Sequence, residues 1–291
     1  MSILSLMGRR SGRVMWPRAS RLVVTTFASA TVALGALSAT AEAQDSRRED
    51  SRREDAFTWS GNMASGRQLF IKNINGGIEV ERSNSGRVEV SAEKRWRRGN
   101  PEMVRIEQKR SGDNIVICAL WEEGSTCDEE GIRSRRGNRW NDRNDVSVHF
   151  TVRVPEGVRL NLSTVNGGIE IDGVTSEVVG STVNGSLRAR GAGGPVRAST
   201  VNGSIHVAVS SRDNAGDLEY STVNGSITVE VPSNFGAQFD LSTVNGRVST
   251  DFPITVSGAL SSRSLRGTVG DGRSRLRAST VNGAITLRRL N

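Results

Sequence analysis

The sequence predicts an all-β protein, most of it a parallel β-solenoid with about 16–22 residues per coil. Three observations predict this fold. The pentapeptide Ser-Thr-Val-Asn-Gly occurs six times, its copies recur at intervals that suit one coil each, and the residues around every copy alternate between apolar and polar. The copies are Ser163–Gly167, Ser181–Gly185, Ser199–Gly203, Ser221–Gly225, Ser242–Gly246 and Ser279–Gly283.

The intervals between copies are close to regular. Measured between successive asparagines, they are 18, 18, 22, 21 and 37 residues. Repeats of about 20 residues are single supersecondary units that must stack to bury a hydrophobic face. The longest interval fits two coils if Leu265-Arg266-Gly267 is a degenerate copy, with Arg266 in place of asparagine.

The alternation around each copy predicts strands on both sides of it. The third residue after each asparagine is aliphatic in every copy, the fifth is nearly as apolar, and the residue between them has no chemical theme. This period of two is typical of a strand with one buried and one solvated face. Each unit is therefore expected to be a strand, a corner and a second strand.

The pentapeptide is predicted to form the corner. Asparagine and glycine also suit hairpin turns, so a meander of hairpins is the alternative, but hairpins would not require matching Ser, Thr and Val. Stacked coils do, because equivalent side chains then form ladders and amides hydrogen-bond along the stack. Glycine is expected to take the tight bend. With the related stretch Asn73–Gly77, the predicted ladder comprises Asn75, Asn166, Asn184, Asn202, Asn224, Asn245 and Asn282, with Gly76, Gly167, Gly185, Gly203, Gly225, Gly246 and Gly283.

Residues 1–43 are interpreted as a secretory signal peptide, with a basic start, an apolar stretch and a small-x-small site that places cleavage between Ala43 and Gln44. A retained membrane anchor is the alternative, and Met15 is an alternative start. Residues 44–55 contain a doubled Ser-Arg-Arg-Glu-Asp run, so a charged, disordered spacer is expected, or else an electrostatic tether. No stable membrane span is expected after cleavage.

Residues 56–157 are predicted to be an N-terminal β-rich region, either a separate packing unit or an end cap, and residues 158–291 the solenoid repeats. The only cysteines, Cys118 and Cys127, are nine positions apart. In an exported chain such a pair is most simply a disulfide; a metal site would need further ligands. An acidic and an Arg-rich loop in this region are either solvated loops or a binding surface.

The charge of the mature chain argues against nucleic acid as a partner. Removal of residues 1–43 takes away five Arg and one Glu, which leaves 34 basic and 30 acidic residues, a net charge of +4. This excess is mild, and the sequence has no basic helix or aromatic stacking motif.

Together these features resemble a bacterial envelope family labelled "putative adhesin", a domain of unknown function with β-strand repeats. The resemblance is carried by Asn75–Val80, by Val152–Leu160 and by the successive Ser-Thr-Val-Asn-Gly turns, and it covers about Leu69–Leu290. It implies an exported adhesin-like binding scaffold in the periplasm, at the outer cell surface or secreted, and it carries no catalytic residues over.

No catalytic, cofactor-binding or metal-binding residues are predicted, and no cofactor is expected. A β-helix polysaccharide-processing enzyme would need carboxylates on neighbouring coils, whereas Glu170 is followed by Arg188 and His206 at the equivalent positions. The favoured hypothesis is a non-catalytic envelope protein with an unknown envelope, glycan or protein partner. The alternative is a structural or stress-related envelope component.

Overall fold

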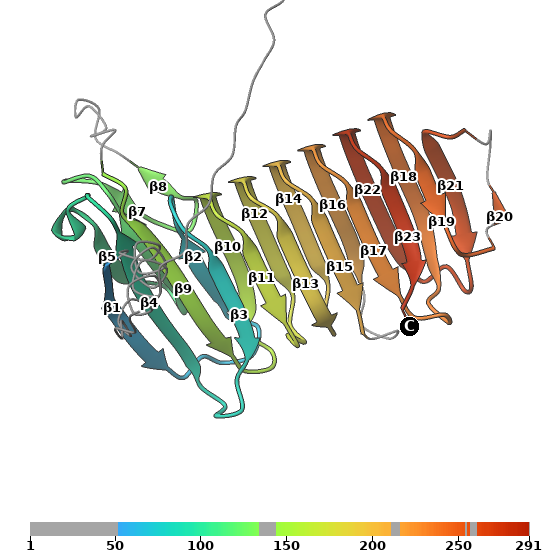
Figure 1. Ribbon diagram of the computed structural model, residues 1–291. Coiled ribbons are helices and arrows are strands. Elements are labelled where there is room, and N and C mark those ends of the chain that lie inside the picture. The colour runs from blue at the N-terminus through green and yellow to red at the C-terminus, as the bar shows by residue number, and fades with distance from the viewer. Residues whose placement is uncertain (1–51, 134–143, 211–215, 254, 257–260, 291) are drawn as a thin grey trace, which may run out of the picture. The chain divides into compact units, whose positions relative to one another are not determined.

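The computed structural model describes residues 52–133, 144–210, 216–253, 255–256 and 261–290. These residues form two large sheets that face each other and a small hairpin (Figure 1). The predicted cleavage site at Ala43 and Gln44, residues 44–51 of the predicted spacer and the Arg-rich stretch 134–143 lie outside the described residues.

The ten-stranded sheet is called sheet A here, and the eleven-stranded sheet is called sheet B. In spatial order, sheet A contains β1 (Arg52–Gly61), β4 (Val88–Trp96), β9 (Ser147–Val154), β3 (Ile78–Arg82), β11 (Ile169–Asp172), β13 (Leu187–Ala192), β15 (Ile205–Val209), β17 (Ile227–Val231), β23 (Ile285–Arg289) and β19 (Val248–Thr250). Sheet B contains β20 (Thr255–Val256), β21 (Ser264–Val269), β18 (Ala237–Asn245), β22 (Ser274–Asn282), β16 (Asp217–Asn224), β14 (Val196–Asn202), β12 (Val178–Asn184), β10 (Arg159–Asn166), β2 (Gln68–Lys72), β6 (Asn114–Leu120) and β5 (Arg105–Ser111). The hairpin pairs β7 (Thr126–Cys127) with β8 (Ile132–Arg133), and a 3₁₀ turn covers Pro101–Met103.

Each pentapeptide ends a strand of sheet B, and the chain then turns into a strand of sheet A. The coils stack in parallel and in register, so that Ile169 lies beside Leu187 and Leu187 beside Ile205. The predicted parallel β-solenoid is therefore confirmed. The alternative, a meander of hairpins, is wrong for these units because their neighbouring strands run parallel.

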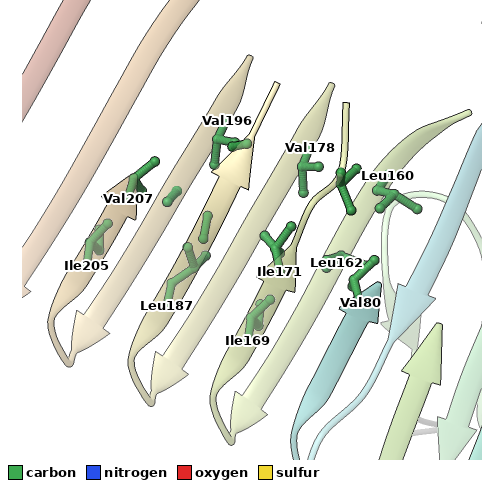
Figure 2. Packing of buried hydrophobic residues seen from close by; sticks show 14 of the residues in the cluster. Val80, Leu160, Leu162, Ile169, Ile171, Val178, Leu187, Val196, Ile205 and Val207 are labelled. Carbon is green, nitrogen blue, oxygen red and sulfur yellow. The ribbon is translucent and has the colours of Figure 1, made fainter. Parts of the chain in front are cut away.

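The hydrophobic core lies between the two sheets, and both sheets supply it with alternate residues (Figure 2). Leu160, Leu162 and Val178 enter it from sheet B, and Ile169 and Ile171 enter it from sheet A, all of them almost completely buried. Strands β2 and β3 form a first coil around Asn73–Gly77, so the N-terminal region and the repeats share both sheets and one core.

The coils do not stack in chain order at the C-terminal end. Strands β22 and β23 lie between the β16–β17 coil and the β18–β19 coil (Figure 1). The expectation of a degenerate coil at Arg266 is wrong. Arg266 lies in β21, which runs antiparallel to β18 and pairs Arg266 with Asp240, so the long interval contains an end strand and not a coil.

Charge alternation favours this insertion. On the outer face of sheet B, one column across neighbouring strands contains, in spatial order, Arg197, Glu219, Arg277, Asp240 and Arg266. Stacking in chain order would instead place Glu219 beside Asp240. Opposite charges that face each other across strands stabilise a sheet, and like charges destabilise it, so Arg277 separates two carboxylates.

The insertion requires two connections to pass close to each other. The segment that enters β18 contains Gly236, and the turn between β21 and β22 contains Gly270 and Asp271. A Cβ atom on Gly236 would come within 1.9 Å of the Asp271 carboxylate, and one on Gly270 would lie 3.0 Å from Gly236 Cα. Glycine therefore allows the two connections to cross at this point.

The spacer prediction is wrong for Arg52–Asp55. These residues belong to β1 and pair with β4, from Arg52 beside Trp96 to Asp55 beside Glu93. Their side chains are exposed, so they bury no apolar surface, as the composition indicates. Backbone pairing with an existing sheet edge does not require burial, and this is why composition alone missed the strand.

Candidate binding surface

The corner asparagines form a continuous amide ladder. The Nδ2 atom of Asn184 donates to Oδ1 of Asn166 at 2.9 Å, and each later coil repeats the bond to its spatial predecessor. The order of the ladder is Asn166, Asn184, Asn202, Asn224, Asn282 and Asn245, which follows the inserted coil. Asn75 of the first coil instead donates to the Val146 carbonyl.

The corner threonines are buried and bind the coil before them. Thr182 Oγ1 donates to the Gly167 carbonyl at 2.9 Å, and Thr200 Oγ1 to the Gly185 carbonyl at 2.9 Å. The same bond recurs in the remaining coils. Each threonine hydroxyl therefore gives a hydrogen-bond partner to a glycine carbonyl of the neighbouring coil, and that carbonyl has no partner within the neighbouring coil itself.

The corner glycines are required mainly by close approach and not by a tight bend. A Cβ atom on Gly203 would lie 2.0 Å from the Gly185 carbonyl oxygen. Only Gly76, at φ +119°, has a clearly left-handed backbone, whereas Gly283, at φ +159°, is nearly extended. The expected role of glycine as a bend residue is thus corrected for the repeats: the space between stacked coils excludes a side chain.

The serine and valine of each pentapeptide face solvent on sheet B. The valines keep 37–57% of their surface exposed, and the serines are half-buried. We call these two columns the Ser–Val surface, which consists of Ser163, Ser181, Ser199, Ser221, Ser279 and Ser242 with Val165, Val183, Val201, Val223, Val281 and Val244. The exposure of the valines was not foreseen, because β-branched residues in strands are usually assigned to a core.

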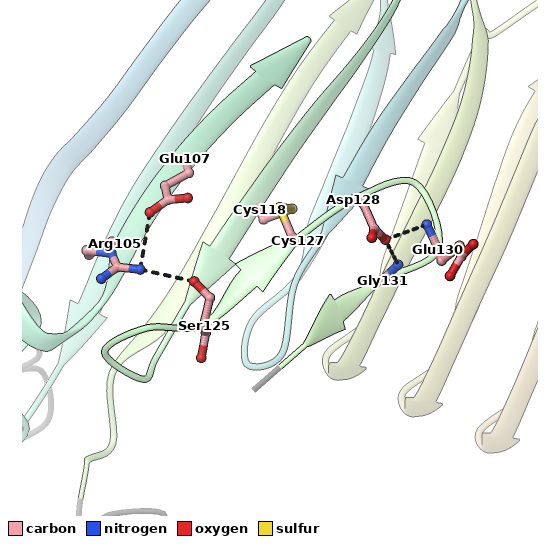
Figure 3. The surroundings of a disulfide bond; sticks show 8 residues. All are labelled: Arg105, Glu107, Cys118, Ser125, Cys127, Asp128, Glu130 and Gly131. Carbon is pink, nitrogen blue, oxygen red and sulfur yellow. Dashed lines mark hydrogen bonds and ion pairs between the residues drawn. A yellow bond between two sulfur atoms is a disulfide. The ribbon is translucent and has the colours of Figure 1, made fainter. Parts of the chain in front are cut away.

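Cys118 and Cys127 form the predicted disulfide (Figure 3). The bond holds the β7–β8 hairpin over the outer face of sheet B. There Phe70, Val116 and Leu120 form a second, smaller core with the two cysteines, and Ile132 packs against it. Asp128 Oδ1 accepts hydrogen bonds from the backbone N–H groups of Glu130 and Gly131, which closes the hairpin turn.

A hollow of about 420 Å³ lies where this hairpin ends and the Ser–Val surface begins. Lys72 lines it and is only 6% exposed, and its Nζ atom donates to Asn161 Oδ1 at 2.9 Å. Burial lowers the pKa of Lys72, although Asp128 and Glu129 act in the opposite direction. Sequence reasoning missed this residue, because nothing local shows that a separate hairpin covers it.

The outer face of sheet A carries side chains that vary from coil to coil. The equivalent positions of successive coils contain Glu79, Glu170, Arg188, His206, Thr228, Thr286 and Ser249. Glu170 lies 3.9 Å from both Arg188 and Arg190, and His206 Nε2 lies 3.4 Å from Glu230. The two arginine–carboxylate pairs are exposed, and such pairs contribute little to stability.

A second hollow, of about 290 Å³, lies at the N-terminal side of this face and is lined by Glu79, Glu170, Arg95, His149 and Thr151 among others. Burial and the neighbouring Arg95 lower the pKa of His149, which favours a neutral ring. Arg95 also hydrogen-bonds Glu93 and lowers the pKa of that carboxyl. The hollow therefore combines carboxylates, a guanidinium, an imidazole and a hydroxyl.

Within the described ranges, no group of three or more His, Cys, Asp or Glu side chains is arranged to hold a metal ion. The part of the chain covered by the structure also contains no helix long and apolar enough to cross a membrane.

Most of the chain, from the first coil to the last, matches a known family model. The model, described as Toastrack DUF4097, matches residues 67–288. The chain belongs to the Toastrack DUF4097 family. The Toastrack match begins just before β2 and ends within β23, so it includes the inserted coil.

Solved structures of other proteins are similar to this chain at low sequence identity. A "putative cell adhesion protein" from Clostridium sporogenes is 10% identical, with a TM-score of 0.47, and the match covers 82% of this chain and 100% of that chain. A "putative adhesin" from Bacteroides fragilis is 8% identical, with a TM-score of 0.32, over 82% of this chain and 97% of that chain. No curated protein matches the chain.

Proposed function

We propose that this protein is an exported, non-catalytic scaffold of the bacterial cell envelope that binds a partner on the outer face of sheet A. The partner is an envelope component, a glycan or another protein. The predicted signal peptide and the disulfide support export, since disulfides persist in oxidising compartments. The adhesin-like names of the structural neighbours agree with this proposal but do not carry it.

One observation carries the proposal. The frame of each coil is constant, because Thr, Asn and Gly of the pentapeptide are used in bonds and close contacts between coils. The outward column on sheet A, from Glu79 to Ser249, changes from coil to coil on this constant frame. A rigid scaffold with varied outward side chains is the usual arrangement of a repeat-protein binding surface.

The partner's chemistry follows from the hollow lined by Glu79, Glu170, Arg95 and His149. Carboxylates and a guanidinium that project from neighbouring strands suit a ligand rich in hydroxyl or amide groups. Binding through such a site depends on geometry and on satisfied hydrogen bonds more than on buried apolar area.

The proposal is tested by binding of the mature chain, beginning at Gln44, to cell-envelope fractions and to a glycan array. In the test variant, Glu79, Glu170 and Arg188 are replaced by serine. The matched control replaces Glu102, Glu123 and Arg110, which are also exposed, by serine.

We expect saturable binding that the test variant reduces at least tenfold and the control leaves unchanged. Absence of binding by the unmodified chain would overturn the proposal and would favour the structural alternative. If the test variant and the control variant bound equally well, the partner would bind elsewhere than the outer face of sheet A.

A further inference from the structure

The hollow beside the disulfide hairpin, called the Lys72 pocket here, has the composition of a ligand site. Its volume is about 420 Å³, and its apolar wall consists of Ile74, Ile132, Val165 and Val183. Ile132 belongs to β8, so the hairpin held by Cys118 and Cys127 closes one side. The other side opens onto the Ser–Val surface.

Lys72 gives this pocket a buried cation. An ammonium group has three N–H donors, and the described contacts of Nζ are one hydrogen bond, to Asn161 Oδ1 at 2.9 Å, and the Phe70 ring, whose centroid is 5.3 Å away. The whole residue is only 6% exposed, and two of the three donors have no partner among the described residues. Burial of a charge is costly unless a partner compensates it.

The nearest acidic side chains are engaged elsewhere. Asp128 pairs with Arg133 at 3.1 Å, and Glu129 accepts a hydrogen bond from Asn114 Nδ2 at 3.1 Å. No carboxylate among the described residues lies within 4.0 Å of the Lys72 ammonium group. The lowered pKa of Lys72, which burial causes, agrees with this incomplete compensation. An anionic ligand group at Nζ would supply the missing partner.

An apolar path, which consists of Ile74 and the valines of the Ser–Val surface, begins beside Lys72. Lys72 pairs in register with Ser163 and therefore begins the serine column, and Ile74, two residues later, begins the valine column. The strands are about 4.8 Å apart, so an extended chain that starts at Lys72 would cross Val165, Val183 and Val201 within about 15 Å. The ligand class thus combines an anion with a hydrocarbon chain.

We propose that the Lys72 pocket binds a single-chain amphiphile with a carboxylate head, such as a long-chain fatty acid. The Lys72 ammonium group holds the carboxylate. The hydrocarbon chain lies on Ile74 and the first valines of the Ser–Val surface, beneath the edge formed by Ile132. This site is separate from the sheet A face of the proposed function and does not depend on it.

The test measures binding of dodecanoate to the mature chain by isothermal titration calorimetry, below the micelle concentration, with dodecanol as the uncharged control ligand. Lys72→Met keeps the length of the side chain and removes the charge. Val183→Thr is nearly isosteric and places a hydroxyl on the apolar path. Val244→Thr makes the same change at the far end of the valine column and serves as the matched control.

We expect the unmodified chain to bind dodecanoate at least tenfold more tightly than dodecanol. Lys72→Met should weaken dodecanoate binding at least tenfold and abolish the preference over dodecanol, Val183→Thr should weaken it about threefold or more, and Val244→Thr should have no effect. A second readout needs no variant: dodecanoate should protect Lys72 from reductive methylation, as measured by peptide mass spectrometry.

Four outcomes would overturn the proposal. The first is that the unmodified chain binds no dodecanoate, and the second is that it binds dodecanol equally well. The third is that Lys72 is methylated at the same rate with and without dodecanoate. The fourth is that the chain binds to anionic phospholipid vesicles but not to dodecanoate, which would assign the surface to a membrane.

Discussion

Tyr220 shows at the scale of one residue how the core selects the order of the coils. It is completely buried and lies between Ala198 on one neighbouring strand and Ala278 on the other. Stacking in chain order would place Leu241 beside it instead of Ala278. Large and small side chains that alternate across strands fill a core at native density, so the inserted coil also relieves crowding at Tyr220.

The Tyr220 hydroxyl has no hydrogen-bond partner among the described residues, and burial raises the pKa of the phenol well above its usual range. A buried polar group without a partner costs about 1–3 kcal/mol. We therefore predict that Tyr220→Phe stabilises the protein by about 1 kcal/mol, with a rise in Tm of about 2–4 °C.

Calorimetric scans of the two proteins under the same conditions check this prediction. Tyr220→Ala is the control, and it should destabilise by about 3–5 kcal/mol because it leaves a cavity. A lower Tm for Tyr220→Phe would show that the hydroxyl has a partner in solution.

At the scale of the element, the corner is held by three kinds of contact between coils. These are the asparagine amide ladder, the hydrogen bond from threonine to a glycine carbonyl, and the close approach of each corner glycine to the corner glycine of the neighbouring coil. All three repeat in register, so each position of the pentapeptide except Ser and Val, which face solvent, has a contact that fixes its identity. The corner is therefore a framework motif.

The amide ladder predicts that replacing an asparagine within the ladder lowers the free energy of unfolding more than replacing one at its end. Asn224 takes part in two ladder bonds, to Asn202 and from Asn282, both at 2.8 Å, whereas Asn245 at the end of the ladder takes part in one. At about 0.5–1.5 kcal/mol per bond, Asn224→Ala should cost about 1–3 kcal/mol and Asn245→Ala about half as much.

Denaturant unfolding measures both values. The ladder account would be contradicted if the two substitutions cost the same or if neither changed the free energy of unfolding.

At the scale of the whole molecule, the order of coils in space differs from their order in the chain. In chain order, the β18–β19 coil comes first, and β21 follows as a strand antiparallel to β18. Strands β22 and β23 come last in the chain but lie inside the stack. The open edge of the β18–β19 coil in sheet B is thereby covered by β21. Covered edges limit pairing with other chains.

Much of this fold follows from the sequence. The two-residue alternation predicts the strands, and the matched pentapeptides predict stacked corners, although the contacts between coils involve the Thr, Asn and Gly of each copy and not the Ser and Val. The spacing of Cys118 and Cys127 in a chain predicted to be exported predicts the disulfide.

The remainder depends on contacts between segments that are distant in the chain. Glu219 and Tyr220 contain the information for the inserted coil. It becomes visible only when Arg277 is compared with Asp240 as the neighbour of Glu219, and Ala278 with Leu241 as the neighbour of Tyr220. The Lys72 pocket likewise requires the β7–β8 hairpin to lie on sheet B, which no local pattern indicates.

The central claim is that the pentapeptides form one stacked framework in which the last coil lies inside the stack. Paired cysteines in the serine column test it most directly. Ser221 pairs in register with Ser279, and Ser279 pairs with Ser242, so Ser221 and Ser242 are two strands, about 9.6 Å, apart. A disulfide requires Cα atoms about 4.4–6.8 Å apart.

The measurement is the yield of the new disulfide, by mass spectrometry of peptides after mild oxidation. The account predicts that Ser221→Cys with Ser279→Cys forms the bond in high yield, and that Ser221→Cys with Ser242→Cys does not. A bond between positions 221 and 242, without one between 221 and 279, would show coils stacked in chain order and would contradict the account.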